Sequence, residues 1–320
     1  MVSNLKGKIV LVTGATRGVG KGIAVGLGET GSTVYITGRT LESSENQFGG
    51  SLIETQTAIE AVGGQCIPVQ IDHSDDRQVA MLFERIQQEQ GKLDLLVNNV
   101  FAGVQAIKNA YGKPFWQAEP NLWDAVNNVG LRSHYVASIY AARLMSQAQQ
   151  GVICTISSWG GLSYIFGAAY GANKSASDRL AADMAVELKP DGIASIAIWP
   201  GIVGTEQIQD FAQQSEETTT ADSWANGYNW ETPLLTGRAI AALLDDPQVM
   251  NYTGKVQIVA ELAAKYNLTD ADGQRPVSLR SLRFVLPFTF APLRKYAHLI
   301  PDLKLPWLFL LWGMLKSPQV

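Results

Sequence analysis

The chain has 320 residues, of which 46% are apolar and 17% are charged, and this is the balance of a globular protein able to bury one large core. The formal net charge of −4 gives no general case for a nucleic-acid partner. From Arg275 onward, however, seven basic residues accompany a single acid, Asp302, which is a local excess of +6. We therefore expect one domain over residues 1–265, followed by a basic extension over residues 266–320.

Cysteine and histidine give no sign of a metal site. Cys66 and Cys154 lie inside apolar, strand-like runs, and we expect both to be buried free thiols. The three histidines are scattered along the chain: His73, His134 and His298. The first apolar run, residues 8–13, is too short for an export signal, so a cytoplasmic location is the default expectation.

A glycine-rich segment follows this first predicted strand. Residues 13–20 read T-G-A-T-R-G-V-G and lead into a helical run. A strand-to-helix turn that binds a dinucleotide needs a tight turn, bare backbone near the pyrophosphate and close helix packing, and glycines supply all three. The segment therefore predicts cofactor contacts from Gly14, Thr16, Arg17, Gly18, Val19 and Gly20.

The second predicted strand, residues 33–37, ends in Gly38 and Arg39 and has no acid at its end. A carboxylate there would bind the ribose 2′-hydroxyl of NAD, whereas an arginine accommodates the 2′-phosphate of NADP. Arg39 and Arg17 therefore favour NADP(H) over NAD(H). The alternative is that both are ordinary surface charges, which does not explain the missing acid.

The rest of the chain alternates strands and helices. Five further strands are predicted, over residues 66–71, 93–100, 151–157, 194–199 and 255–259. The main helices are predicted over residues 52–61, 78–90, 121–145, 170–188 and 236–244. This order predicts an α/β fold with a Rossmann-type, doubly wound parallel sheet of seven strands. Residues 206–230, rich in Gln, Thr and Trp, are expected to form a substrate lid.

Tyr170 and Lys174 lie four residues apart among small, helix-compatible residues, so they should share one helix face. A cation beside a phenol favours the phenolate and lowers a pKa that is ordinarily about 10. Ser158, at a predicted strand end, can hold a carbonyl oxygen while Tyr170 supplies its proton. The pair also occurs by chance as a packed Tyr and a solvated Lys, and it is the upstream pattern that favours catalysis.

Taken together, these signals resemble the short-chain dehydrogenase/reductase family over roughly residues 5–262. They are T-G-A-T-R-G-V-G, Asp72, N-N at 98–99, Ser158, Y-G-A-N-K at 170–174 and P-G-I-V-G-T at 200–205. The resemblance implies that Tyr170 exchanges the proton, that Lys174 lowers its pKa and holds the nicotinamide ribose, and that Ser158 orients the carbonyl. It further implies cofactor contacts from Asp72, Asn98, Tyr170, Lys174, Pro200, Gly201, Ile202 and Thr205. A homodimer or homotetramer is also expected by resemblance.

Two departures from the family pattern stand out. Val100 and Phe101 replace the Ala-Gly that usually follows the two asparagines. Gly130 stands where many members carry an Asn that holds a water of the proton relay. With Asn127 and Asn128 nearby, either a shifted relay or a direct water path is expected.

Aromatic residues cluster in segments expected to rim the site: Phe101, Trp116, Trp159, Tyr164, Phe166, and in the lid Trp224, Tyr228 and Trp230. Ser158, Phe101 and Trp159 are the expected substrate contacts. The sequence thus predicts an NADP(H)-dependent oxidoreductase that reduces a bulky hydrophobic ketone or aldehyde, or oxidises the matching alcohol. The alternative is a non-catalytic NADP(H)-binding protein that acts as a redox sensor or scaffold.

The extension contains W-L-F-L-L-W-G-M-L at residues 307–315, without a charge and between Lys304 and Lys316. Because about 20 apolar residues are needed to cross a bilayer, no transmembrane helix is expected. An apolar segment beside basic residues can lie in a membrane interface. The other possibility is an arm packed on its own domain or on a partner subunit.

Overall fold

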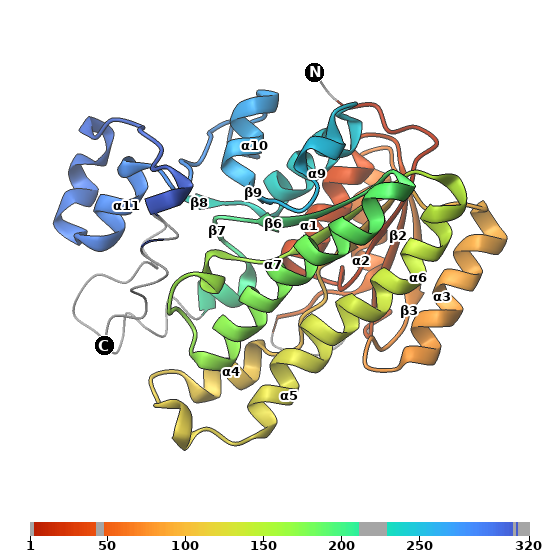
Figure 1. Cartoon of the computed structure of the whole chain (residues 1–320), viewed down its shortest axis with the longest axis horizontal. Helices are drawn as coiled ribbons and strands as arrows, with labels where there is room; N and C mark the ends of the chain where they lie inside the picture. The colour runs from red at the N-terminus through yellow and green to blue at the C-terminus, as the bar shows by residue number, and fades with distance from the viewer. Residues whose placement is uncertain (1–2, 43–47, 211–228, 310–311, 313–320) are drawn as a thin grey trace.

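A computed structural model of the chain describes residues 3–42, 48–210, 229–309 and 312 (Figure 1). Its centre is a parallel sheet of seven strands in the order β3-β2-β1-β4-β5-β6-β9. The strands are β1 (Ile9–Val12), β2 (Thr33–Gly38), β3 (Gln65–Gln70), β4 (Leu95–Asn98), β5 (Gly151–Ile156), β6 (Ile193–Trp199) and β9 (Val256–Ile258). The doubly wound, seven-stranded sheet predicted from the sequence is confirmed.

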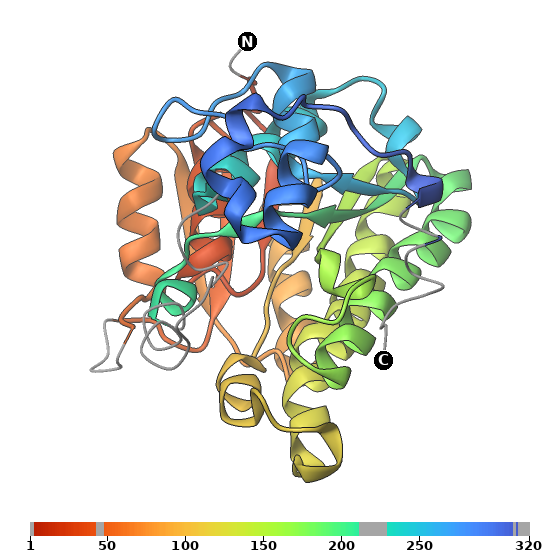
Figure 2. The same ribbon diagram turned by 90° about the vertical axis from the view of Figure 1, so that its left-hand side faces the viewer.

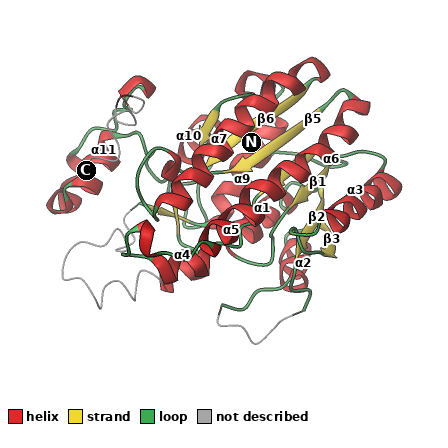
Figure 3. Ribbon diagram, turned by 60° about the horizontal axis from the view of Figure 1, so that its bottom comes forward, coloured by secondary structure: helices red, strands yellow, loops and turns green. Residues whose placement is uncertain are grey.

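Helices cover both faces of the sheet, and Figure 3 shows the yellow strands between layers of red helices. On one face lie α1 (Gly18–Gly28), α2 (Leu52–Ala61), α9 (Pro233–Asp245) and α10 (Val259–Tyr266). On the other lie α3 (Asp76–Gln90), α6 (Ser133–Ala148) and α7 (Ala168–Leu188). The central strands β1, β4, β5 and β6 are buried along their whole length, which is why they are apolar at nearly every position rather than at alternate ones.

The helix predicted over residues 121–145 is interrupted. It consists of α5 (Asn121–Asn127), a π-helical turn η2 (Asn128–Arg132) and α6. Within η2, Val129 and Gly130 leave helical geometry, and Gly130 has φ +152°, a conformation that favours glycine. The freed carbonyl of Val129 accepts a 3.0 Å hydrogen bond from the N–H of Ala102. The helical pattern in the sequence continues through this break because it reports side-chain polarity and not backbone geometry.

Shorter elements complete the described chain. They are α4 (Val104–Ala110), η1 (Phe115–Gln117), η3 (Trp159–Gly161), η4 (Lys189–Asp191), β7 (Ile202–Val203), β8 (Trp230–Glu231), η5 (Val249–Tyr252), α11 (Leu282–Thr289) and η6 (Ala291–Leu299). The expected lid lies mostly outside the described residues, as do Trp224 and Tyr228. At the two described ends of the lid segment, β7 pairs with β8.

The C-terminal extension folds back on the domain. Figure 1 shows α11, in blue, beyond β7 and β8, at the end of the molecule opposite α3, and Figure 2 shows the blue extension from that end. Leu279 and Phe284 are buried in a cluster with Trp199 and Ile258 of the sheet. Over the described residues the extension is therefore a packed arm, and it shares a core with the domain.

Candidate active site

A cleft of about 630 Å³ opens at the carboxyl ends of the strands. It lies where the strand order reverses, because β1 is flanked by β2 on one side and by β4 on the other. Ligands of open α/β sheets bind at this switch point, since the two neighbouring loops turn away in opposite directions and leave a crevice. All the polar side chains discussed next lie at this edge of the sheet.

The glycine-rich loop lines the cleft and leaves no room for a side chain at Gly14 or at Gly20. Gly14 has φ +69°, and a Cβ there would lie 2.6 Å from the Cα of Val100. A Cβ on Gly20 would lie 2.2 Å from the carbonyl oxygen of Gly14. The N-terminus of α1, at Gly18, opens into the cleft and offers backbone N–H groups without helical partners, which suits an anion. The loop therefore fits the pyrophosphate of a dinucleotide.

Nearly every predicted cofactor residue lines this cleft. They are Gly14, Thr16, Arg17, Gly18, Val19, Gly20, Arg39, Asp72, Tyr170, Lys174, Pro200, Gly201, Ile202 and Thr205. Asp72 accepts hydrogen bonds from the backbone N–H and the hydroxyl of Ser74, at 2.9 and 2.8 Å. Burial opposes ionisation of Asp72, but these bonds and the charge of Arg39 prevail and lower its pKa.

Asn98, also predicted as a cofactor contact, does not line the cleft. Its side chain is fully buried, and its Nδ2 donates to the hydroxyl of Ser138 at 2.9 Å. Asn99 lines the cleft instead, with Nδ2 donating to the carbonyl oxygens of Thr13 and Gly14. Successive residues of a strand point to opposite faces, so only one of two adjacent asparagines can face the cleft.

Ser158 and Tyr170 meet across the cleft. Ser158 follows β5, and Tyr170 lies in the first turn of α7, so two different elements present them. Their hydroxyl oxygens are 3.0 Å apart and share a hydrogen bond. The ring of Tyr170 is held edge-to-face between Phe101 and Phe166, with centroid distances of 6.2 and 5.2 Å. The two hydroxyls are therefore placed to contact one oxygen atom together.

Lys174 lies one turn further along α7 and is buried. Its Nζ donates to the carbonyl oxygen of Ile156 at 3.3 Å and lies 5.1 and 5.6 Å from the ring centroids of Phe101 and Tyr170. Burial lowers the pKa of Lys174 to about 8, although the charge of Asp178 opposes the shift. The cation is thus held by a carbonyl and two ring faces in a poorly hydrated place.

The pKa of Tyr170 shifts against the sequence-based expectation. Burial raises it, while the hydrogen bond with Ser158 acts in the opposite direction, and the net shift is upward. The loss of hydration around the phenol therefore raises the pKa of Tyr170 by more than the hydrogen bond with Ser158 lowers it. Tyr170 consequently holds its proton at neutral pH.

The ring of Phe101 occupies the space that a side chain at position 130 would need. A Cβ on Gly130 would lie 2.6 Å from Cδ2 of the Phe101 ring. Neither nearby asparagine turns toward Lys174: Nδ2 of Asn127 donates to the carbonyl oxygen of Trp123 at 3.0 Å, and Asn128 is exposed. These contacts speak against a relay shifted to Asn127 or Asn128.

The predicted aromatic rim is only partly present. Phe101, Trp159 and Phe166 line the cleft. Trp116 and Tyr164 do not line it, and both rings are mostly exposed. The sequence also missed part of the lining, namely Leu279, Phe284 and Phe288 of the extension. Their apolar character is visible in the sequence, but no local signal says which surface they cover.

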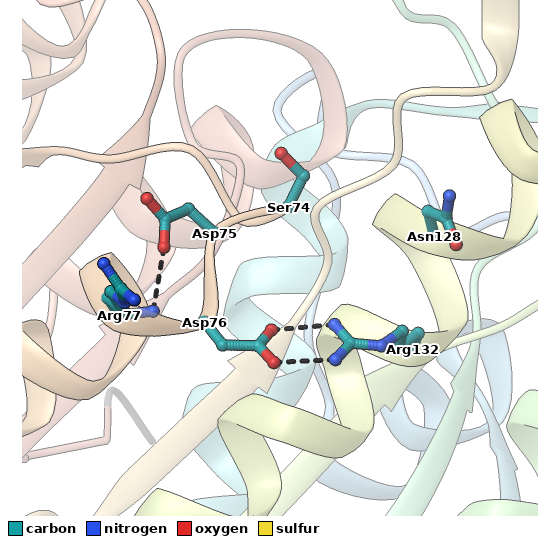
Figure 4. Close-up of a pocket in the computed structure, with 6 residues that line it drawn as sticks. All are labelled: Ser74, Asp75, Asp76, Arg77, Asn128 and Arg132. Carbon is teal, nitrogen blue, oxygen red and sulfur yellow. Dashed lines mark hydrogen bonds and ion pairs between the residues drawn. The ribbon is translucent and has the colours of Figure 1, made fainter.

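A second hollow, of about 550 Å³, lies between the start of α3 and the η2 turn. Figure 4 shows its six lining residues: Ser74, Asp75, Asp76, Arg77, Asn128 and Arg132. Asp76 and Arg132 form a two-pronged ion pair with distances of 2.7 and 2.6 Å. With Asp75 and Arg77 the lining carries two acids and two bases, so its formal charges balance, and we place the functional site in the larger cleft.

The part of the chain that the structure describes contains no group of His, Cys, Asp and Glu able to hold a metal ion. Its two cysteines are free thiols, Cys154 buried and Cys66 partly buried. Within the same residues no helix is both long and apolar enough to cross a bilayer.

A doubly wound sheet, a glycine loop at its switch point and a Ser-Tyr pair beside a buried Lys define a dinucleotide-dependent oxidoreductase of the Rossmann type. A family model described as short chain dehydrogenase matches residues 8–216. The chain belongs to the short-chain dehydrogenase/reductase family, whose members use a nicotinamide cofactor.

Two curated relatives are similar over nearly the whole chain. The chain is 44% identical over 283 residues to dehydrogenase/reductase SDR family member 1 of Mus musculus, covering 87% of each chain. It is 43% identical over 290 residues to the Homo sapiens protein of the same name, covering 89% of this chain and 90% of that one. Among solved structures, a metagenomic short-chain oxidoreductase in complex with NADP is similar with a TM-score of 0.61 and 26% identity, over 79% of this chain and 96% of that one.

Proposed function

We propose that the protein reduces the carbonyl group of a bulky apolar ketone or aldehyde with NADPH, and oxidises the matching alcohol in reverse. The observation that carries the proposal is the 3.0 Å contact between the hydroxyls of Ser158 and Tyr170 inside the cleft, with Lys174 buried beside them. Two hydroxyl donors that converge on one point suit an oxygen atom that becomes negative during reaction.

The reduction assigns one role to each side chain. The nicotinamide, when bound, supplies the hydride to the carbonyl carbon. Ser158 donates a hydrogen bond to the carbonyl oxygen, and Tyr170 transfers its proton to the same oxygen as charge develops. The raised pKa of Tyr170 keeps that proton in place beforehand. Lys174, with its Nζ 5.6 Å from the centre of the Tyr170 ring, stabilises the phenolate that remains.

NADP(H) is favoured over NAD(H) by the charges at the end of β2. Arg39 follows Gly38 directly, both line the cleft together with Arg17, and no acid occupies the end of this strand. An arginine there can pair with a 2′-phosphate, whereas NAD offers it only a hydroxyl. The NADP complex of the structural neighbour supports the same preference.

The deciding experiment measures turnover of NADPH and NADH by the purified protein with a panel of apolar ketones, aldehydes and quinones. Tyr170→Phe keeps the ring contacts with Phe101 and Phe166 and removes only the hydroxyl. We expect turnover with NADPH and a loss of about 10²- to 10⁴-fold in kcat in the variant. A Tyr170→Phe variant as active as the wild type would refute the mechanism. NADPH binding without turnover of any carbonyl would favour the non-catalytic binding protein instead.

We further propose that the extension makes peripheral contact with a membrane surface in the cytoplasm. Its described part exposes a set of apolar side chains next to basic ones: Leu299, Leu303, Leu308, Phe309 and Trp312 beside Arg294, Lys295 and Lys304. Such a surface is attracted to anionic headgroups. Co-sedimentation with anionic vesicles that is unchanged on deletion of residues 275–320 would refute this contact.

By family resemblance we propose a homodimer or homotetramer. Light scattering on the purified protein tests this directly, and a monomer at micromolar concentration would refute it.

A further inference from the structure

The C-terminal extension contributes to the same cleft as the catalytic hydroxyls. Leu279, Phe284 and Phe288 line it together with Ser158 and Tyr170, although more than 100 residues separate the two groups in the chain. Phe284 is buried, with 2% of its surface exposed, whereas Phe288 is 39% exposed. The extension therefore presents a buried ring and, one turn of α11 later, a half-exposed ring to the site.

A continuous row of aromatic rings leads from Ser158 to the extension. Trp159, the residue after Ser158, meets Phe284 edge-to-face with ring centres 6.5 Å apart. Phe284 in turn stacks on Phe288 at 5.2 Å, with 23° between the ring planes. Rings in such contact form one apolar surface, so a ligand whose reactive group lies at Ser158 can rest along it.

The extension is also fixed relative to the catalytic residues. Arg280 donates from Nε and Nη2 to the two carboxylate oxygens of Glu261 on α10, at 2.9 and 2.8 Å. Its guanidinium lies 4.7 Å from the ring centre of Trp307, and Trp307 meets Trp199 at 6.0 Å. Nε1 of Trp199 donates to Asp178, one turn beyond Lys174 on α7, at 2.9 Å. An ion pair and two indole rings thus connect the extension to the helix that carries Tyr170.

We infer that α11 is the far wall of the substrate pocket, and that Phe288 is a specificity-determining residue which binds the apolar body of a rigid, polycyclic ketone. This inference rests on the proposed reduction at Ser158 and Tyr170 and adds the part of the chain that selects among carbonyls. A small ketone occupies the space at the two hydroxyls and does not reach α11. A polycyclic ketone covers the accessible faces of Trp159 and Phe288, behind which Phe284 is packed, and gains free energy in proportion to the apolar area removed from water.

The test compares Phe288→Ala with Phe290→Ala in the full-length protein. Phe290 lies just past the end of α11, is 59% exposed and is not part of the cleft lining, so it is a matched control for loss of a ring from the extension. For a polycyclic ketone we expect KM to rise about 5- to 30-fold in Phe288→Ala, as expected for partial loss of one ring contact. For a small aliphatic ketone, the difference in KM between the two variants should be much smaller than for the polycyclic ketone, so the ratio of the KM values of the two ketones changes only in Phe288→Ala.

Equal kinetics of Phe288→Ala and Phe290→Ala toward the polycyclic ketone would overturn the inference. A binding measurement separates this failure from failure of the proposed reduction. Calorimetry gives the Kd of the ketone for the NADP-loaded protein in the Tyr170→Phe background, where no turnover is needed. Weaker ketone binding in Phe288→Ala but not in Phe290→Ala would support α11 as the far wall of the pocket, even if the wild type reduced no ketone. An unchanged Kd in Phe288→Ala would refute this role of α11, even if the wild type reduced the ketone.

Discussion

The ion pair between Arg280 and Glu261 predicts a measurable contribution to stability. Both side chains are largely buried, at 12% and 21% exposure, and Arg280 also donates to the carbonyl oxygen of Leu305 at 2.9 Å. Arg280→Met keeps an apolar stem on Trp307 and removes the charge, which leaves the carboxylate of Glu261 with the 2.6 Å hydrogen bond from Ser278 and the charge of Lys304. Removing one member of a buried pair costs about 3–5 kcal/mol, and partial exposure reduces this to about 2–4 kcal/mol.

Urea unfolding followed by tryptophan fluorescence measures this cost. Arg179→Met is the control, because Arg179 and Asp183 form an exposed pair within one helix, from which we expect no measurable change. A double-mutant cycle with Glu261→Gln isolates the coupling between Arg280 and Glu261, which should exceed about 1 kcal/mol. If Arg280→Met unfolded at the same urea concentration as Arg179→Met, the ion pair would not hold the extension in place.

Two further predictions concern Gly130 and Glu231. Gly130→Ala should lower the free energy of unfolding by about 1–3 kcal/mol more than Gly112→Ala, because both glycines have positive φ but, of the two, only Gly130 would place a Cβ against the ring of Phe101. In urea unfolding, Phe101→Leu in the Gly130→Ala background should recover part of this loss. Equal effects of the two glycine substitutions would contradict the overlap. Burial raises the pKa of Glu231 from an ordinary 4.5 to about 8. Between these two pH values the folded protein holds a proton that the unfolded chain releases. The free energy of unfolding of the wild type should therefore fall as pH rises from about 4.5 to 8. Glu231→Gln keeps an oxygen that accepts the 2.9 Å hydrogen bond from the N–H of Gly201. Because glutamine does not titrate, the fall in the free energy of unfolding between pH 4.5 and 8 should be smaller in this variant by a few kcal/mol. Parallel stability–pH curves of wild type and variant would show that Glu231 is ionised in the folded state.

Phe101 and Gly130, the two departures from the family pattern, pack against each other in the structure. Each is a single unusual residue in the sequence, about 30 positions apart. In the fold the ring of Phe101 fills the space that a side chain at position 130 would need, and it also faces Lys174. A side chain at position 130 would therefore collide with the ring of Phe101, and a small residue at position 101 would leave a void beside Gly130.

The sequence by itself determined the order of the elements and the chemistry of the site. Apolar runs of β-strand length alternate with helical periods, and these local patterns suffice for the seven-stranded sheet. Ser158, Tyr170 and Lys174 were likewise recognisable, because the motifs before and after them in the chain resemble those of the short-chain dehydrogenase/reductase family. Their contact at the carboxyl edge then follows from the parallel arrangement of the strands.

Only the tertiary structure decided which side chains surround that chemistry. In the structure Asn99, not Asn98, lines the cleft, and Phe284 and Phe288 of the extension line it as well. The helix predicted over residues 121–145 is interrupted at Gly130, and Trp116 is exposed to solvent. The tertiary structure also decided the direction of the Tyr170 pKa shift, because burial is set by neighbours from several elements. These outcomes depend on contacts between residues far apart in the chain, and local polarity and spacing carry no information about them.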